Sequence, residues 1–341
     1  MRETKAPSCG QWRTGSEIGR GAYGVVYLAT GSDGAMAAVK VCRRSEVRDE
    51  RYERELRGAK LYSSIPPQEG LVHMREFAEA PWGFYAVMDL ADDEFGREHL
   101  EGASYRPKTL ASVIDGEKAL PLGECVKLGI ALAKGLATLQ RHHLLHRDIK
   151  PGNVIYVRGR PVLSDPGLVV EESKAASLVG TPGYVPPENF TTAAGDVFSL
   201  GLTLKAASFG RRIEDLDKGP ALEADTGAKL FPVWWRILNK ATDPTPSRRY
   251  QSAKAMLKDL ASLRVRMAIP SMGVILSVMV AVGLAVAIYY AVSAKNKIEE
   301  KERRERNYIE QQRQEAKRAV ENSKQKLGEM LKDLRNMRNK K

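Results

Sequence analysis

Three glycines near the start of the chain could bring the backbone close to phosphate groups. They are Gly19, Gly21 and Gly24, spaced G-x-G-x-x-G and followed by the β-favouring run Val25–Leu28. Because glycine has no Cβ, a loop of this kind leaves room for phosphate oxygens. Dinucleotide-binding loops share the spacing, but a helix follows their glycines directly, whereas a strand is expected here. The order therefore favours a glycine-rich hairpin.

A lysine that could reach phosphate oxygens follows at the end of an apolar strand. Lys40 ends the run Ala-Ala-Val-Lys, sixteen residues after Gly24. A lysine at a strand end is usually solvated, so the argument depends on the order of glycine loop, lysine and acidic helix. The partner predicted for Lys40 is Glu55, because Glu53 would share its helix face with Arg57.

The run from His146 to Asn153 reads His-Arg-Asp-Ile-Lys-Pro-Gly-Asn. It resembles the catalytic loop of the eukaryotic-type, or Hanks-type, serine/threonine protein kinases. In that family the aspartate positions the substrate hydroxyl and accepts its proton, and the asparagine holds a metal ion. The resemblance implies these roles for Asp148 and Asn153, and it implies that Lys150 steadies the transferred phosphate. It also implies a structural role for His146 and Arg147.

Small-molecule phosphotransferases share a reduced form of this loop, so further segments are needed to decide between the families. The run Ser-Asp-Pro-Gly at residues 164–167 stands where protein kinases have Asp-Phe-Gly. The resemblance implies that Asp165 binds Mg²⁺, a hard cation that suits carboxylate and phosphate oxygens. Pro166 replaces the aromatic residue of the family.

The segment from Gly180 to Glu188 resembles the end of the activation segment of serine/threonine kinases, which small-molecule kinases lack. The resemblance places Thr181 in this segment and implies a buried structural ion pair between Glu188 and Arg249. Asp196 resembles the aspartate that begins the following helix of the family. Two serines of the segment are candidate regulatory phosphorylation sites, namely Ser173 and Ser177.

The resemblance also implies that ATP and Mg²⁺ are the cofactors and that they bind between two lobes. Met88 and the residues after it are similar to the family's adenine-binding hinge. The residues expected to form the nucleotide site are Ile18, Gly19, Gly21, Gly24, Val26, Ala38, Lys40, Glu55, Met88, Asp89 and Ala91.

Hydrophobic periodicity predicts the elements that position these residues. Short β-like runs at 24–29, 35–41 and 84–90, with a charged helix around 46–62, indicate a small sheet-rich lobe. Apolar helical patterns at 122–139, 195–209 and 231–263 indicate a larger helical lobe, and 211–230 reads as a loop. We therefore expect an α+β, two-lobed protein-kinase-like fold, with an N-terminal extension at 1–14, the small lobe at about 15–91 and the large lobe at about 92–265.

A run of 28 residues at 267–294 carries no charge and is rich in Val, Ala, Ile and Met. About 20 such residues span a bilayer as a helix. Arg266 and Lys295 flank the run as interfacial anchors would, and Pro270 would lie in its first turn, where proline is tolerated. A single transmembrane helix is predicted, because buried core helices rarely run so long without a polar face.

The charged tail at 295–341 is predicted to be helical. Apolar residues recur in its last heptads at the spacing of a coiled-coil seam, at Met330, Met337, Val320, Leu327 and Leu334. A short coiled coil and a solvated helix of alternating charge both fit this pattern.

Charge and cysteine content limit the other classes of function. After residue 294, 16 Lys and Arg residues stand against 9 Asp and Glu residues, which gives +7 of the total formal charge of +12. The excess therefore lies mostly in the tail, and no nucleic-acid-binding signature accompanies it. The three cysteines, Cys9, Cys42 and Cys125, lack the spacing of a disulfide framework or a zinc site.

The sequence thus predicts a membrane-anchored serine/threonine protein kinase that acts in signalling and does not bind nucleic acid. The resemblance to bacterial transmembrane kinases implies a single-pass protein of the bacterial inner membrane with its kinase domain in the cytoplasm. Expected partners are protein substrates, the membrane and a second copy of the chain through the tail or the span. An inactive pseudokinase scaffold at the membrane is the alternative, because Pro166 departs from the family pattern.

Overall fold

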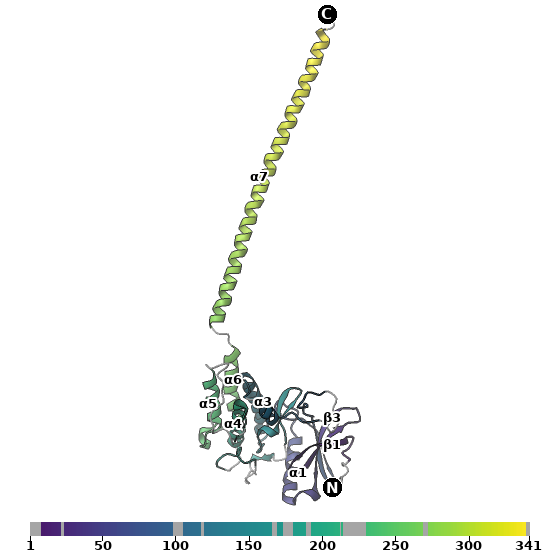
Figure 1. Ribbon diagram of the computed structural model, residues 1–341, viewed down its shortest axis with the longest axis vertical. Coiled ribbons are helices and arrows are strands. Elements are labelled where there is room, and N and C mark those ends of the chain that lie inside the picture. Colours follow the sequence, from purple (N-terminus) through teal and green to yellow (C-terminus); the bar gives the residue numbers. More distant parts are fainter. Residues whose placement is uncertain are drawn as a thin grey trace. The chain divides into compact units, whose positions relative to one another are not determined.

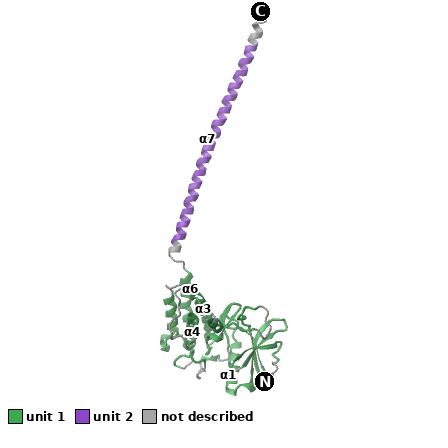
Figure 2. Ribbon diagram, in the orientation of Figure 1, with its two compact units in different colours: residues 1–269 green, residues 270–341 purple. Residues whose placement is uncertain are grey.

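The computed structural model describes residues 8–21, 24–97, 105–116, 119–165, 169–172, 180–188, 192–211, 213, 230–268 and 272–338. The chain forms two compact units, Met1–Ile269 and Pro270–Lys341 (Figure 2). The first unit begins with a sheet and continues with helices, as the colours of Figure 1 show. This confirms the predicted α+β fold with a sheet-rich lobe followed by a helical lobe.

The small lobe is built on a five-stranded antiparallel sheet with the order β1-β2-β3-β5-β4. Its strands are β1 (Arg13–Gly21), β2 (Gly24–Thr30), β3 (Met36–Arg43), β4 (Met74–Ala80) and β5 (Gly83–Met88). The register of β2 against β3 sets Val26 opposite Lys40. Since β1 and β2 close as a hairpin at Gly21 and Gly24, the glycine loop lies next to the strand that carries Lys40.

One helix of the small lobe, α1 (Asp49–Ser63), packs on this sheet. Its apolar face meets the sheet through Tyr52 and Ala59, and the ring of Tyr52 lies 5.7 Å from the ring of Phe84 on β5. Because residues three and four apart share a helix face, Glu55 lies on this buried side of α1. The helix therefore carries a carboxylate into the interior of the lobe.

The large lobe is mainly helical. Its helices are α2 (Leu110–Gly116), α3 (Leu122–Arg141), α4 (Ala193–Phe209), α5 (Phe231–Ala241) and α6 (Ala253–Ala268). Two small ladders pair β6 (Leu144–Leu145) with β9 (Val170–Glu171), and β7 (Val154–Val157) with β8 (Arg160–Leu163). Apolar side chains of α3 to α6 form one core, in which Trp234 is fully buried and donates from Nε1 to Oγ of Ser208 at 3.0 Å.

The helical stretch predicted at 231–263 is wrong as one element, because it forms the two helices α5 and α6. Pro244 and Pro246 lie between them, and proline removes a helical hydrogen bond donor and clashes with the preceding turn. Most of the predicted loop at 211–230 lies outside the described residues. The three cysteines are buried without a disulfide, which agrees with small packed side chains.

The second unit is the single helix α7 (Met272–Arg338). Within it, Leu276–Lys332 contains a segment long and apolar enough to cross a membrane, with a mean hydropathy of 2.1 in its most apolar window and side chains that are not buried. Length and composition alone support this assignment, and the predicted span therefore stays a prediction. Met267 and Ala268, the first residues of the predicted span, belong to α6, and α7 begins at Met272. Pro270, predicted for the first turn of the span, lies outside the described residues.

Candidate active site

A cavity of about 290 Å³ lies in the first unit and is lined by both lobes. All but one of the residues predicted for nucleotide binding line it, namely Ile18, Gly19, Gly21, Gly24, Val26, Ala38, Lys40, Met88, Asp89 and Ala91. Asn153 and Asp165, the predicted metal ligands, line it as well. The exception is Glu55, which reaches the cavity only through its contact with Lys40.

The glycine hairpin lines the cavity, and the close packing of its strands explains why one of its positions must be glycine. A Cβ at Gly24 would collide with the carbonyl oxygen of Val41, so only glycine fits where β2 runs so close to β3. A Cβ at Gly19 would meet Val26 at 3.8 Å, an ordinary contact. The requirement for glycine at Gly24 therefore comes from strand packing, whereas the position of Gly19 would admit a Cβ. Ala22 and Tyr23 lie outside the described residues.

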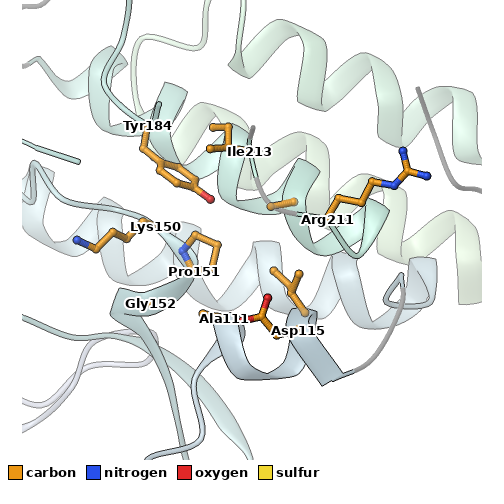
Figure 3. Close-up of a pocket in the computed structure, with 10 residues that line it drawn as sticks. Ala111, Asp115, Lys150, Pro151, Gly152, Tyr184, Arg211 and Ile213 are labelled. Carbon is orange, nitrogen blue, oxygen red and sulfur yellow. The ribbon is translucent and has the colours of Figure 1, made fainter. Parts of the chain in front are cut away.

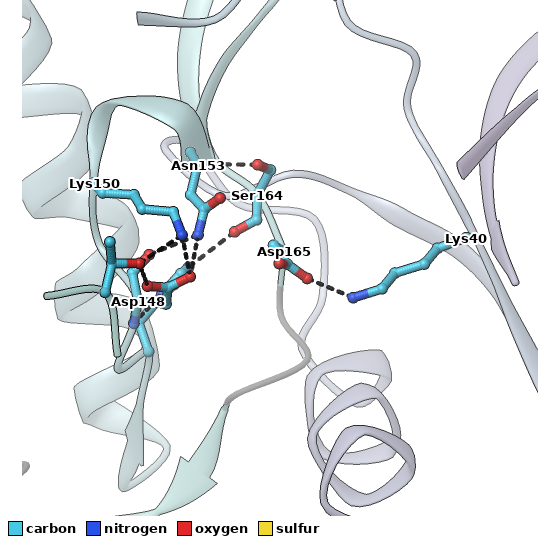
Figure 4. A network of polar contacts seen from close by, with 8 residues as sticks. Lys40, Asp148, Lys150, Asn153, Ser164 and Asp165 are labelled. Atoms are coloured by element: carbon cyan, nitrogen blue, oxygen red, sulfur yellow. Dashed lines mark hydrogen bonds and ion pairs between the residues drawn. The ribbon is translucent and has the colours of Figure 1, made fainter. Parts of the chain in front are cut away.

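Lys40 joins two carboxylates at the back of the cavity (Figure 4 shows the contact with Asp165). Its Nζ lies 3.1 Å from Oε2 of Glu55 and 2.6 Å from Oδ1 of Asp165. Glu53, the rejected partner, instead contacts Arg44 at 3.2 Å on the surface. One ammonium group, on β3 of the small lobe, thus contacts both the buried face of α1 and the segment that carries Asp165.

Burial and the neighbouring charges have opposite effects on the pKa values of Lys40, Glu55 and Asp165. Burial alone would lower the pKa of Lys40, but the charges of Asp165 and Glu55 outweigh it and raise that pKa. For Asp165 the attraction of Lys40 exceeds the effect of burial, so its pKa is lowered. Burial dominates at Glu55 and raises its pKa, with the Lys40 charge opposing. Lys40 and Asp165 are therefore a charged pair at neutral pH.

Asp148 is held by three side chains of the large lobe (Figure 4). Its Oδ2 accepts from Nδ2 of Asn153 at 2.7 Å and from Nζ of Lys150 at 2.9 Å. Its Oδ1 accepts from the hydroxyl of Thr181 at 2.7 Å, and that hydroxyl accepts in turn from Lys150 at 2.6 Å. Side chains from two predicted motifs, the run 146–153 and the segment 180–188, therefore meet at the Asp148 carboxylate.

Asp196, at the start of α4, binds the backbone just before Asp148. Its two carboxylate oxygens accept from the N–H groups of His146 and Arg147, at 2.8 and 2.9 Å. Arg147 adopts a positive φ of 71°, a conformation that L residues seldom take, so these bonds hold a strained turn. His146 also lies 3.1 Å through Nε2 from the carbonyl oxygen of Ser164, next to Asp165. This contact links the loop that carries Asp148 to the segment that carries Asp165.

The predicted ion pair between Glu188 and Arg249 is present and lies away from Asp148. The two guanidinium Nη atoms bind the two carboxylate oxygens at 2.6 and 2.7 Å, and the Arg249 side chain is fully buried. Burial opposes ionisation of Glu188, yet the bonds from Arg249 lower its pKa. The pair ties the end of the activation segment to the loop before α6. Its contacts indicate a structural role.

A second cavity of about 200 Å³ adjoins the loop that carries Asp148 (Figure 3). Lys150, Pro151 and Gly152 form one side, α2 supplies Ala111 and Asp115, and Tyr184 belongs to the activation segment. The lining is mostly apolar side chains with a few polar ones. The loop that carries Asp148 therefore borders a hollow of side-chain size.

Several residues that line the larger cavity are not predicted from the sequence, among them Tyr105, Pro107, Thr109, Ile155 and Ser164. The first three follow β5 in a charged segment without helical or strand periodicity. A tyrosine and a proline inside such a segment were the only signals available. Two predicted phosphorylation sites, Ser173 and Ser177, lie outside the described residues, as does Pro166.

The residues present fit a nucleotide with a hard cation. Asn153 and Asp165 offer amide and carboxylate oxygens at the cavity, and Lys40 offers a fixed positive charge for phosphate. The described part of the chain holds no group of three or more His, Cys, Asp or Glu side chains that could bind a metal ion. Mg²⁺ fits this situation, because it commonly binds one or two protein oxygens together with phosphates and water.

Comparison with known proteins gives a consistent result. Residues 12–267 match the family model described as protein kinase domain. The serine/threonine-protein kinase AfsK of Streptomyces griseus is 30% identical over 209 residues, which cover 57% of this chain and 23% of that protein. The serine/threonine-protein kinase PknK of Mycobacterium tuberculosis is 30% identical over 252 residues, covering 70% and 20%. The serine/threonine-protein kinase BRI1-like 2 of Arabidopsis thaliana is 31% identical over 222 residues, covering 60% and 18%. The matches therefore span about a fifth of the length of these relatives.

Proposed function

The chain belongs to the protein kinase family, and from this premise we propose that it transfers the γ-phosphate of ATP to serine or threonine hydroxyls of proteins. The observation that carries the proposal is the set of contacts around Asp148, in which Lys150, Asn153 and Thr181 all bind one carboxylate. Lys150 and Thr181 are the features that resemble the serine/threonine branch. The relatives named as serine/threonine-protein kinases support the same branch.

Asp148 would orient the attacking hydroxyl and accept its proton. Three donors already hold the carboxylate, so it does not need to reorganise when a substrate arrives. Lys150 lies 2.9 Å from Asp148 and can stabilise charge that develops on the transferred group. The mostly apolar cavity beside Lys150 would take up a side chain of the protein substrate (Figure 3).

The other half of the site would hold the nucleotide. The glycine hairpin, Ala38 and Met88 enclose the cavity, and Lys40 would bind phosphate oxygens. Asn153 and Asp165 would hold Mg²⁺. When bound, this ion neutralises charge on the phosphates. Glu55 positions Lys40, because its side chain is almost fully buried and lies 3.1 Å from the ammonium group.

A lysine and an aspartate substitution test the catalytic proposal. Lys40→Met and Asp148→Asn should each abolish incorporation of labelled phosphate into the chain itself and into a generic protein substrate. Matched controls are Lys60→Met and Asp49→Asn, which make the same chemical changes at exposed side chains. Undiminished incorporation in the first two variants would refute the assignment and favour an inactive scaffold.

We further propose that α7 anchors the kinase domain in a membrane as a single span and that the domain faces the cytoplasm, where ATP is available. The uncharged run of α7 and its flanking basic residues support the span. The need for ATP, and not the distribution of basic residues, supports the orientation. A signalling role and pairing of two copies through the tail or span belong to the same proposal. Carbonate extraction of membranes from expressing cells tests the anchor. Release of the full-length chain into the soluble fraction would contradict it.

A further inference from the structure

One face of α7 carries basic and apolar side chains in a single line, which we call the tail stripe. Its members are Arg313, Lys317, Val320, Lys324, Leu327 and Leu331. They follow one another at intervals of alternately four and three residues, so they lie on one side of the helix. The three apolar members are 56 to 58% exposed. In the described part of the chain the stripe is therefore uncovered.

The tail stripe is mostly basic in its first half and apolar in its second. The acidic residues of the same stretch lie at other positions around the helix, namely Glu315, Glu321 and Glu329. The ion pairs found in the described part of α7 all lie before residue 307. The three basic members of the stripe therefore have no acidic partner among the described residues, and their positive charges follow one line.

A second copy of the tail does not complement this stripe. Two stripes in contact, whether parallel or antiparallel, would bring basic side chains against basic or apolar ones, because the stripe contains no acidic residue. Like charges at facing positions of two helices select against that pairing. Pairing of two copies, proposed above for the tail or the span, would therefore use the span and not this stripe.

A lipid surface does not fit the stripe well either. A helix that lies on a membrane has an apolar side along its whole length and basic residues beside that side. In the tail stripe, basic and apolar residues follow one another along the same line. Moreover, α7 is one continuous helix (Figure 2). At a rise of about 1.5 Å per residue, Arg313 lies about 27 Å along the axis from Lys295, the first charge after the uncharged run.

We propose that the tail stripe binds an acidic amphipathic helix of a different protein. Such a helix would place acidic side chains opposite Arg313, Lys317 and Lys324, and apolar side chains opposite the second half of the stripe. The spacing of the stripe selects a helix as the partner, because side chains on the contact face of a second helix recur at the same intervals. The inference goes beyond the proposed kinase function and requires neither activity nor a membrane span.

The probes are three labelled synthetic peptides with the length of residues 300–338. The native peptide keeps the sequence of the chain and represents a second copy. The acidic peptide carries substitutions on the stripe, Arg313→Glu, Lys317→Glu and Lys324→Glu. The off-stripe peptide has the same net charge but carries its substitutions elsewhere on the helix, Arg303→Glu, Lys326→Glu and Lys332→Glu. Fluorescence anisotropy measures the binding of each peptide to the full-length chain in detergent at low salt.

We expect the acidic peptide to bind at least tenfold more tightly than the other two, because three ion pairs replace three contacts between like charges. Added salt should weaken this binding, since the pairs are exposed. Full-length chain that carries the three stripe substitutions should show the reverse preference and bind the native peptide more tightly than the acidic one. Full-length chain that carries the three off-stripe substitutions should keep the preference of the wild type.

Four results would overturn the inference. Equal binding of the native peptide would show that a second copy fits the stripe as well, and equal binding of the off-stripe peptide would show that net charge alone matters. Absence of binding by the acidic peptide would exclude the site. Binding in nanodiscs of phosphatidylcholine that is lost when phosphatidylglycerol is included would show that anionic lipid takes up the stripe. Each of these results leaves the proposed kinase function intact, because Lys40→Met and Asp148→Asn test it separately.

Discussion

Removing the hydroxyl of Thr181 should slow phosphoryl transfer without weakening nucleotide binding. In Thr181→Val the side chain keeps its shape, but Asp148 loses a 2.7 Å hydrogen bond and Lys150 loses a 2.6 Å one. Hydrogen bonds to charged groups contribute about 1.5 to 3 kcal/mol each. If losing the bond to Asp148 weakens transition-state stabilisation by that amount, kcat falls by roughly 10- to 150-fold.

Steady-state phosphorylation of a protein substrate at varied ATP concentration separates the two effects. The KM for ATP should stay within about twofold of the wild type, because Thr181 does not line the nucleotide cavity. Thr181→Ser retains the hydroxyl and should keep most of the activity. Thr203→Val is the matched control, since it removes a buried hydroxyl that bonds only within α4, to Ser199 at 2.9 Å. A kcat for Thr181→Val within threefold of the wild type would refute the reasoning.

Two further predictions concern the metal and the ion pair. Chelation of Mg²⁺ should reduce ATP affinity at least tenfold by calorimetry, because Asp165 repels phosphate when no cation lies between them; equal affinity with and without the metal would contradict this. Glu188→Gln should lower the free energy of unfolding by about 3 kcal/mol, since it leaves Arg249 buried without its anionic partner. The folded pKa of Glu188 lies below its ordinary 4.5, so the pair stabilises fully above that pH and less as pH falls further. On acidification below about pH 4.5, the free energy of unfolding measured with denaturant should therefore fall more for the wild type than for Glu188→Gln. Parallel pH profiles of the two proteins would show that the ion pair does not cause the pH dependence.

The sequence predicted well those residues whose positions follow from periodicity or from a local motif. Glu55 could be chosen over Glu53 because a helix repeats every 3.6 residues, and the structure places Glu55 inside and Glu53 on the surface. The sheet-rich and helical lobes followed from the change of period along the chain. The functional roles of Asp148 and the residues around it stay predictions, although the structure brings those residues together.

The wall formed by residues 105–109 could not be predicted, because no periodic pattern describes it. Its path depends on Asp92 and Asp93, whose carboxylates bind backbone N–H groups far apart in the sequence, for example in the turn at Arg158. Carboxylates compete for backbone donors in many ways, and sequence spacing does not show which donors they reach. The hydrogen bond from the Tyr105 hydroxyl to the carbonyl oxygen of Ala91, at 3.0 Å, is a consequence of this folding and was missed for the same reason.

The two acidic residues of the site differ in what holds them, and this difference bears on how the site works. Asp148 is bound by Lys150, Asn153 and Thr181, all from the large lobe, so its geometry does not depend on the position of the small lobe. Asp165 is bound by Lys40, which the small lobe supplies. A phosphate that binds the Lys40 ammonium group would compete with Asp165 for it. A cation bound at Asp165 would replace the positive charge that Asp165 loses. In the proposed function, the loop that carries Asp148 would therefore be ordered before a nucleotide binds, whereas the contact between Lys40 and Asp165 would have to give way to phosphate and a cation.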